Sequence, residues 1–204
     1  MNLLLLTSSP RGKASYSTQL ALELAGRIEG AHITVRDLTN NPLPHIGPEF
    51  VHAVFTPEAD RTPTQREALV LSDQLIAELN NADIVVIGAG MINFGMPSGL
   101  KSWLDHVTRA GVTFRYGAAG PEGLVTGKKV ILVLATGGIY STGPMTPLDH
   151  MEPHLRTSLG LLGMTDVETI LIEGTAMGPE ATEEALTGAR AKAVALTAPY
   201  SFIK

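Results

Sequence analysis

Hydroxyl side chains gather just after the first apolar run of the sequence. Serine or threonine stands at positions 7, 8, 9, 15 and 17, and a helical stripe of Leu20, Leu24 and Ile28 follows. Hydroxyl groups in a loop that enters a helix suit an anion, because free N–H groups and the helix dipole point to the same place. The pattern predicts a monophosphate site that needs no metal. The alternative is an ordinary helix cap by Ser15 or Ser17.

Two sharper phosphate motifs do not fit this sequence. A Walker loop needs glycine at the position of Thr7 and serine or threonine at that of Ala14. The dinucleotide fingerprint lacks its third glycine, because Asn93 stands at that position after Gly88 and Gly90. What remains is the binding of a monophosphate by hydroxyl and amide groups.

Two glycine-containing turns follow apolar runs that predict buried strands. The run 84–87 leads through glycines into Met91-Ile92-Asn93-Phe94, which we expect to form the wall against which a flat cofactor lies. The run 130–135 ends at Gly137 and Gly138, where backbone N–H groups can approach a ligand closely. A plain turn is the alternative for the second stretch.

Other residues with reactive side chains carry weaker signals. The sequence has no cysteine, so thiolate catalysis, disulfides and thiolate metal sites are excluded. His150 and His154 stand one helical turn apart, but Glu152 faces away from them and no third ligand is evident, so we expect no metal site. No nucleophile, base and acid set is visible. Trp103 lies on an apolar stripe and suits packing or an interface.

An aromatic pair alternates in residues 112–116, where Phe114 and Tyr116 share one face. A glycine-rich excursion follows them, so we expect a hairpin. Its aromatic side chains could pack in the core, form an interface, or cap a flat ligand, and the pattern does not decide among these.

The remaining apolar patterns predict the elements that must position the loops. Strands are expected at residues 2–6, 32–38, 84–87, 130–135 and within 166–173. Helices are expected after Ser17, over 64–80, after Pro97, on the stripe from Leu148 to Leu162, and on the small-residue face from Ala181 to Ala193. Residues 39–63, with Pro42, Pro44, Pro48 and Pro57 among them, predict a long irregular connection.

This alternation predicts an α/β fold in which a doubly wound, five-stranded parallel sheet lies between two layers of helices. We expect a single domain over residues 1–204, because no change in composition marks a boundary. The loops after the first, third and fourth strands then all leave the carboxyl edge of the sheet, where such folds bind ligands.

The composition limits the partners. The chain has 204 residues and a formal net charge of −5 without a basic run, which argues against nucleic-acid binding. The first apolar run spans only Leu3–Leu6, with basic residues after it, and is typical of a strand rather than a signal peptide. No apolar stretch is long enough to cross a membrane. We therefore expect a cytoplasmic protein.

The chain resembles a known family, the FMN-dependent NADH-azoreductases and NADH:quinone oxidoreductases of flavodoxin-like fold. The shared segments keep their order over most of the chain. They are Ser-Ser-Pro-Arg with Ser15-Tyr16-Ser17, Met91–Phe94, Arg109–Tyr116, Pro121–Lys128, Gly137-Gly138 and Glu173-Gly174.

The resemblance implies a set of assignments to FMN. It implies that Ser9, Ser15, Tyr16 and Ser17 hold the FMN phosphate, that Met91, Ile92, Asn93 and Phe94 line the isoalloxazine ring, and that Ala135, Thr136, Gly137 and Gly138 contact its pyrimidine end. It also implies one FMN per subunit of a homodimer, with Tyr116 near the substrate face. The electron donor would be NADH or NADPH.

The chain also departs from the pattern of this family. Many members carry tyrosine where Ile92 stands, and serine-arginine where Ala135-Thr136 stand. The loss of an aromatic ring and a charge affects the substrate range and the flavin potential that the resemblance implies. FMN binding is less affected, because the backbone donors remain.

The resulting hypothesis is a ping-pong reductase of quinones and aromatic azo compounds, in which the flavin carries the chemistry and no side chain acts as acid or base. Amides of Gly137 and Gly138 would stabilise negative charge on the reduced ring. One alternative is a flavodoxin-type electron carrier that does not oxidise NAD(P)H in steady state. Another is a scaffold of the same fold that binds a partner without flavin.

Overall fold

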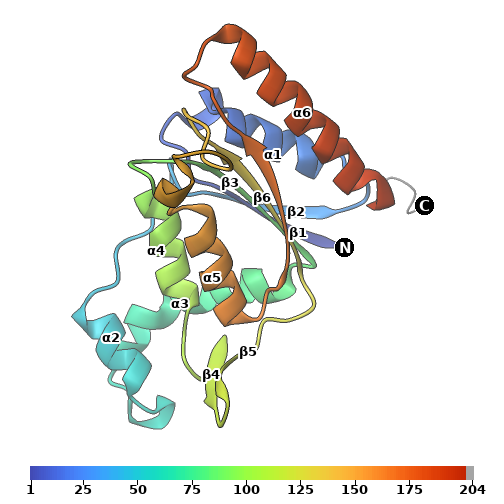
Figure 1. The fold of residues 1–204 in the computed structure, drawn as a ribbon. Coiled ribbons are helices and arrows are strands. Elements are labelled where there is room, and N and C mark those ends of the chain that lie inside the picture. Colours follow the sequence, from blue (N-terminus) through green and yellow to red (C-terminus); the bar gives the residue numbers. More distant parts are fainter. Residues whose placement is uncertain (201–204) are drawn as a thin grey trace.

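A computed structural model describes residues 1–200 of the chain as a five-stranded parallel sheet with helices on both faces (Figure 1). The strand order is β2-β1-β3-β6-β7. The bounds are β1 Asn2–Thr7, β2 His32–Asp37, β3 Ile84–Gly90, β6 Lys129–Ala135 and β7 Asp166–Ile172. Every pairing in this sheet is parallel, so the carboxyl ends of all five strands meet at one edge. The predicted α/β class and five-stranded parallel sheet are confirmed.

The helices form two layers, as the periodicity predicts. Helices α1 (Tyr16–Gly26) and α6 (Pro179–Thr197) cover one face, and α3 (Pro63–Asn81), α4 (Ser98–Val107) and α5 (Glu152–Leu162) cover the other (Figure 1). Successive strand side chains point to opposite faces, so Leu4 and Leu6 pack under α3 and α4 while Leu3 and Leu5 pack under α1. This two-sided burial explains the unbroken apolar runs of the central strands.

The connection over residues 39–63 was predicted to be irregular, and this prediction is wrong in its second half. Helix α2 (Pro48–Phe55) and the 3-10 turn η2 (Glu58–Asp60) lie there. Proline is compatible with the first position of a helix, where Pro48 stands, because the missing N–H would have no partner there anyway. Phe50 and Ala53 of α2 pack against Leu69 of α3, which gives this short helix a buried face.

The stripe from Leu148 to Leu162 is helical only from Glu152 onward. Leu148 ends the 3-10 turn η3 (Thr146–Leu148), and Met151 occupies the N-cap position of α5. Pro153 is tolerated in the first helical turn but would break a helix that began a turn earlier. The helix therefore starts later than its apolar spacing suggests.

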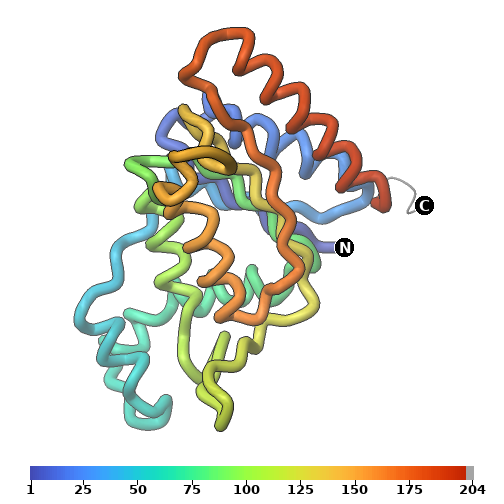
Figure 2. Tube along the Cα trace, in the orientation of Figure 1, coloured from blue at the N-terminus to red at the C-terminus, as the bar shows by residue number. Residues whose placement is uncertain are grey.

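The hairpin of β4 (Phe114–Gly117) and β5 (Gly120–Gly123) lies at the opposite end of the molecule from the loops that follow β3 and β6 (Figure 2). It packs against the end of α5, and a Cβ at Gly123 would lie 2.1 Å from the backbone nitrogen of Gly163. Glycine is therefore required at this contact.

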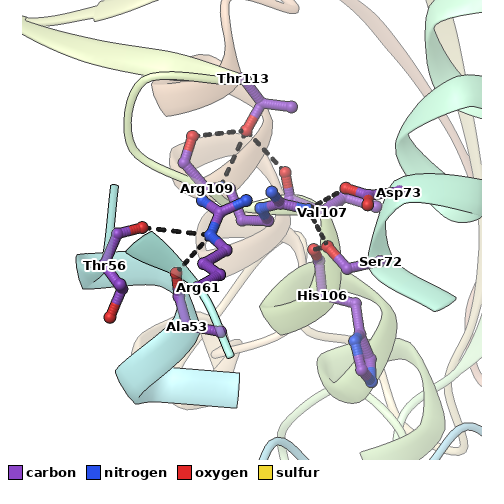
Figure 3. A network of polar contacts seen from close by, with 9 residues as sticks. All are labelled: Ala53, Thr56, Arg61, Ser72, Asp73, His106, Val107, Arg109 and Thr113. Atoms are coloured by element: carbon purple, nitrogen blue, oxygen red, sulfur yellow. Dashed lines mark hydrogen bonds and ion pairs between the residues drawn. The ribbon is translucent and has the colours of Figure 1, made fainter. Parts of the chain in front are cut away.

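A buried polar network fixes the end of α4 against α3 (Figure 3). The buried guanidinium of Arg109 donates to Ser72 Oγ at 3.1 Å and pairs with the carboxylate of Asp73. Ser72 Oγ in turn donates to the carbonyl of His106 at 2.6 Å, and Thr113 Oγ1 donates to the carbonyl of Val107 at 2.6 Å. These residues lie away from the carboxyl edge and hold the hairpin and α4 in place.

Candidate functional site

Four loops meet at the carboxyl edge of the sheet and enclose a cavity of about 280 Å³. They follow β1, β3, β6 and β7. Eight of the predicted cofactor residues line this cavity. They are Ser9, Ser15, Tyr16, Met91, Ile92, Ala135, Thr136 and Gly137.

Sequence reasoning missed five lining residues, and the structure leaves four predicted ones outside the lining. Those outside are Ser17, Asn93, Phe94 and Gly138; Ser17, Asn93 and Gly138 each follow a lining residue directly, and Phe94 lies two residues after Ile92. Those missed are Pro10, Arg11, Gly90, Thr175 and Ala176. The last two belong to the loop after β7. That strand pairs with β6, so its position beside the fourth strand was the signal that could have found them.

The β1 loop presents buried hydroxyl groups to the start of α1. Ser9, Ser15 and Ser17 are each less than a twentieth exposed, and Ser15 Oγ lies 2.9 Å from Ser17 Oγ. Ser15 occupies the N-cap position of α1 but its side chain makes no capping hydrogen bond. The amides of the first helical turn have no partner within the helix. Hydroxyl and amide groups thus remain together at the positive end of the helix dipole.

Helix α1 can reach this position because Gly88 of β3 has no side chain. A Cβ there would lie 2.9 Å from Ala21 Cβ and 3.0 Å from the carbonyl oxygen of Ser17. The glycine therefore allows α1 to pack directly on the strand. The serines at the start of the helix are brought to the sheet edge by this contact.

The loop after β3 makes a tight two-residue turn with unusual backbone angles. Ile92 and Gly95 exchange backbone hydrogen bonds of 2.9 and 3.0 Å, and Asn93 and Phe94 between them have φ angles of 47° and 70°. Positive φ at both central residues defines a type I′ turn. Asparagine tolerates this conformation, but phenylalanine rarely adopts it. Such strain is concentrated at functional sites, where the surrounding structure holds it in place.

Neighbouring loops hold that turn from two sides. Met91 N–H donates to the carbonyl of Ala135 at 2.9 Å, and His150 N–H donates to the carbonyl of Phe94 at 2.9 Å. The ring of Phe94 meets that of Tyr140 edge to face, with 6.3 Å between centroids. The turn is therefore fixed before any ligand binds.

The loop after β6 is bound to the loop after β7 through its carbonyl groups. The carbonyls of Thr136, Gly137 and Gly138 accept hydrogen bonds of 3.0–3.1 Å from amides of residues 174–176. Within residues 1–200 the amides of Gly137 and Gly138 have no acceptor. Two such donors beside a cavity can bind an electron-rich ligand edge.

Glu173 anchors the far end of the same loop. Its Oε1 accepts the amides of Tyr140 and Ser141 at 2.6 and 2.9 Å, and its Oε2 accepts the hydroxyl of Ser141. Tyr140 is thereby held against Phe94, so this carboxylate links the loops after β6 and β3. Hydrogen bonds to an ionised group are among the stronger ones in proteins.

A larger cavity of about 770 Å³ lies beside the first one. Pro10 and Ile92 line both cavities, so the two spaces are adjacent. Its walls come from the segment after β2, the first turn of α4 and the start of α5. Lys101, His45, His150 and His154 are its basic lining residues.

The remaining predicted positions lie elsewhere. Tyr116 lines neither cavity; it is 77% exposed on the hairpin, and its ring contacts that of Phe114 at 5.5 Å. Trp103 is fully buried in the core between the sheet and α4. Among residues 1–200 no group of three or more His, Cys, Asp or Glu side chains could hold a metal ion. None of the helices in this part of the chain is both long and apolar enough to span a membrane.

The chain is similar to known proteins in both sequence and structure. Residues 1–196 match the model of a protein family described as flavodoxin-like fold. The chain is 52% identical to the FMN-dependent NADH:quinone oxidoreductase of Mesorhizobium japonicum over 97% of its own length and 96% of that protein. It is 50% identical to the protein of the same name from Agrobacterium fabrum, over 94% and 95% of the two chains.

A solved structure is also similar to this chain, at lower sequence identity. The azoreductase from Bacillus anthracis superimposes with a TM-score of 0.89 and 27% identity, over 97% of this chain and 98% of that one. The similarity extends over nearly the whole of both chains.

Proposed function

The chain belongs to the FMN-dependent NADH:quinone oxidoreductases of flavodoxin-like fold, and from this premise we propose that it binds FMN at the carboxyl edge and reduces quinones and aromatic azo compounds with NADH. The observation that carries the proposal is that one cavity is lined both by the hydroxyl-bearing start of α1 and by Gly137, whose amide, like that of its neighbour Gly138, has no acceptor among the described residues. These features suit the two ends of one FMN molecule.

The residues at each end of the cavity fit the corresponding part of FMN. Ser9, Ser15 and Ser17 offer hydroxyl groups for the phosphate, and the first turn of α1 adds amides. The amides of Gly137 and Gly138 suit the electron-rich pyrimidine end of the ring. None of the described residues that line the cavity is Asp or Glu, so no carboxylate opposes the phosphate there.

When bound, FMN supplies hydride acceptance from NADH and two-electron transfer to the quinone. The protein contributes orientation and electrostatics. The amides of Gly137 and Gly138 would stabilise negative charge at the pyrimidine end, as donors do in an oxyanion hole. The fixed turn at Asn93 and Phe94 would orient the ring. No side chain is required as a general acid or base.

We propose that NADH and the acceptor use the same face of the site in turn, which is a ping-pong order. The test is steady-state kinetics with menadione or an azo dye at several NADH concentrations. Ping-pong exchange gives parallel double-reciprocal lines, and intersecting lines would contradict it. A flavodoxin-type carrier would bind FMN without oxidising NADH in steady state, so the same assay separates the two functions.

Three further parts of the proposal have their own measurements. The chain acts as one domain in a homodimer with one FMN per subunit, which sedimentation and flavin absorbance would test. The names of the relatives support NADH as donor, and a comparison of kcat/KM for NADH and NADPH tests this preference. Dependence on NADH also favours a cytoplasmic location, which cell fractionation would test.

A further inference from the structure

The cavity of about 770 Å³ beside Ile92 has no assigned ligand, although its volume is in the range typical of small-molecule sites. Its walls are apolar for the most part. Leu38, Pro42, Leu43 and Met96 offer a surface on which a flat ring can lie. A cavity of this size and character suits a ligand with an apolar or aromatic body.

The polar groups of the cavity favour a negative charge on that ligand. Lys101, His45, His150 and His154 line it, and none of its described lining residues is Asp or Glu. Each imidazole can donate a hydrogen bond in its neutral form as well as in its charged form. The cavity therefore offers donors from three separate segments of the chain.

The nearest carboxylates by sequence have other partners. Asp105 pairs with Lys101 one helical turn along α4, and the Lys101 side chain is still 45% exposed in this pair. Asp37 accepts the amides of Thr39 and Asn40 at 3.0 and 3.1 Å. Asp149 accepts the amides of Met151 and Glu152, the second of these at 3.1 Å. Asp37 and Asp149 are thus engaged by backbone amides, and among the described residues the three histidines have no carboxylate partner, whereas Lys101 shares its charge with Asp105.

The cavity also adjoins the FMN site, because Pro10 and Ile92 line both spaces. A ligand that reacts at the turn after β3 can therefore extend over Ile92 into the larger cavity. NADH has this shape: a reacting nicotinamide joined through a doubly negative pyrophosphate to a flat adenine.

We propose that this cavity binds the adenosine diphosphate half of NADH, with Lys101 and the three histidines contacting the pyrophosphate and the apolar wall contacting the adenine. This inference rests on the proposed function and adds a donor subsite to it. Lys101 is then a residue that decides between donors, because dihydronicotinamides without the adenosine diphosphate half would gain nothing from it.

The first test is calorimetric titration of the FMN-loaded protein with ADP, which measures binding without turnover. The wild-type protein is expected to bind ADP, and Lys101→Ala is expected to weaken the binding about tenfold, as the loss of one charged hydrogen bond predicts. His154→Ala, a substitution on a different helix, is expected to weaken it as well. Absence of ADP binding to the wild-type protein would overturn the proposal.

The second test compares NADH with 1-benzyl-1,4-dihydronicotinamide, a donor that lacks the adenosine diphosphate half. In Lys101→Ala the ratio of kcat/KM for NADH to that for the truncated donor is expected to fall about tenfold. An unchanged ratio would overturn the proposal.

Two matched variants serve as controls. Lys129→Ala removes a lysine of a similar ion pair, with Asp166, at the amino edge of the sheet, and should leave the ratio unchanged. Asp105→Asn removes the partner of Lys101 while keeping the lysine, and should also leave the ratio high. A fall of the ratio in either control equal to that in Lys101→Ala would count against the subsite.

If neither donor reduced a quinone, the proposed function would fail, and the ADP titration would still decide this inference.

Discussion

The side chains of Ser15 and Ser17, at the start of α1, are buried. Their hydroxyl groups form a hydrogen bond of 2.9 Å with each other. Replacing both with alanine is expected to weaken FMN retention, by roughly 1.5–3 kcal/mol for each lost hydrogen bond to the charged phosphate. The measurement is FMN affinity from quenching of flavin fluorescence.

Thr18→Val is the matched control for this double variant. Thr18 lies on the same helical turn, and its buried hydroxyl has no hydrogen-bond partner among the described residues. Its removal should leave FMN affinity nearly unchanged. Equal retention of FMN in the double variant and the control would indicate that the phosphate binds at another part of the carboxyl edge.

Glu173 offers a second test on a single side chain, because its carboxylate holds Tyr140 and Ser141 through three hydrogen bonds. Glu173→Ala is expected to release the loop after β6 and to weaken FMN binding at least tenfold. Glu173→Gln keeps an acceptor oxygen and is expected to recover most of that affinity. If the glutamine variant bound FMN as weakly as the alanine variant, charge rather than loop anchoring would be the role of this residue.

Asp37, at the end of β2, makes the stability of the fold depend on pH. Burial raises its pKa, but hydrogen bonds from Asn40 and Thr39 and the nearby Lys13 outweigh this effect, so the pKa lies below its ordinary value. The unfolded chain then binds the proton more tightly, and the stabilisation from Asp37 is present above about pH 4 and is lost as the pH falls through the native pKa.

Asp37→Asn is therefore expected to lower stability near neutral pH and to have less effect at about pH 3.5. Urea unfolding midpoints of the two proteins at both pH values provide the measurement. A difference that grew on acidification would contradict the assigned direction of the pKa.

At the scale of elements, the contact between α1 and β3 determines where the phosphate loop lies. Gly88→Ala would bring a methyl group to 2.9 Å from Ala21 Cβ, and is expected to destabilise the fold by about 1–3 kcal/mol. Gly26→Ala, at the end of the same helix, has no atom within 4 Å of the added methyl and should be neutral or stabilising. Thermal unfolding of both variants tests the pair; a stable Gly88→Ala protein would contradict the required contact.

The elements themselves could be predicted largely from the sequence, because strands buried on both faces leave unbroken apolar runs and helices leave apolar stripes. Helix α2 was missed since its buried face is only Phe50 and Ala53, too few residues to show a helical period in a proline-rich segment. The start of α5 was misjudged because apolar spacing does not show that Pro153 must lie in the first turn of a helix.

The site could be predicted less completely, for a physical reason. The residue types of Ser9, Ser15 and Gly137 indicate a site. Thr175 and Ala176 hold the loop after β6 through backbone amides, which almost any residue type can do, although Thr175 Oγ1 adds a hydrogen bond to the carbonyl of Thr136. The direction in which the Gly137 and Gly138 amides point depends on pairing with a loop more than thirty residues away in sequence. No local sequence pattern indicates the pairing between these two loops.

At the scale of the whole molecule, two large aromatic side chains lie in water on the described surface. Phe55 is 80% exposed on α2 and Tyr116 is 77% exposed on the hairpin. Such side chains are enriched at protein interfaces, which is consistent with the proposed homodimer. We expect sedimentation to give twice the 21.6 kDa mass of one chain.

Tyr116→Ser is expected to shift this equilibrium toward the monomer, because it removes an aromatic contact from the interface. Val194→Ser, on α6 and the opposite face of the sheet, serves as the control and should leave the mass unchanged. A stable dimer of the Tyr116 variant would assign the interface to another surface.

The type I′ turn also limits how acceptor preference can evolve or be engineered. Asn93 and Phe94 have left-handed backbone angles, so most replacements there would distort the turn before they altered selectivity. Ile92 is not among the residues with positive φ, and its side chain borders both cavities. A saturation library for new acceptors is therefore best directed at position 92, with its two left-handed neighbours kept unchanged.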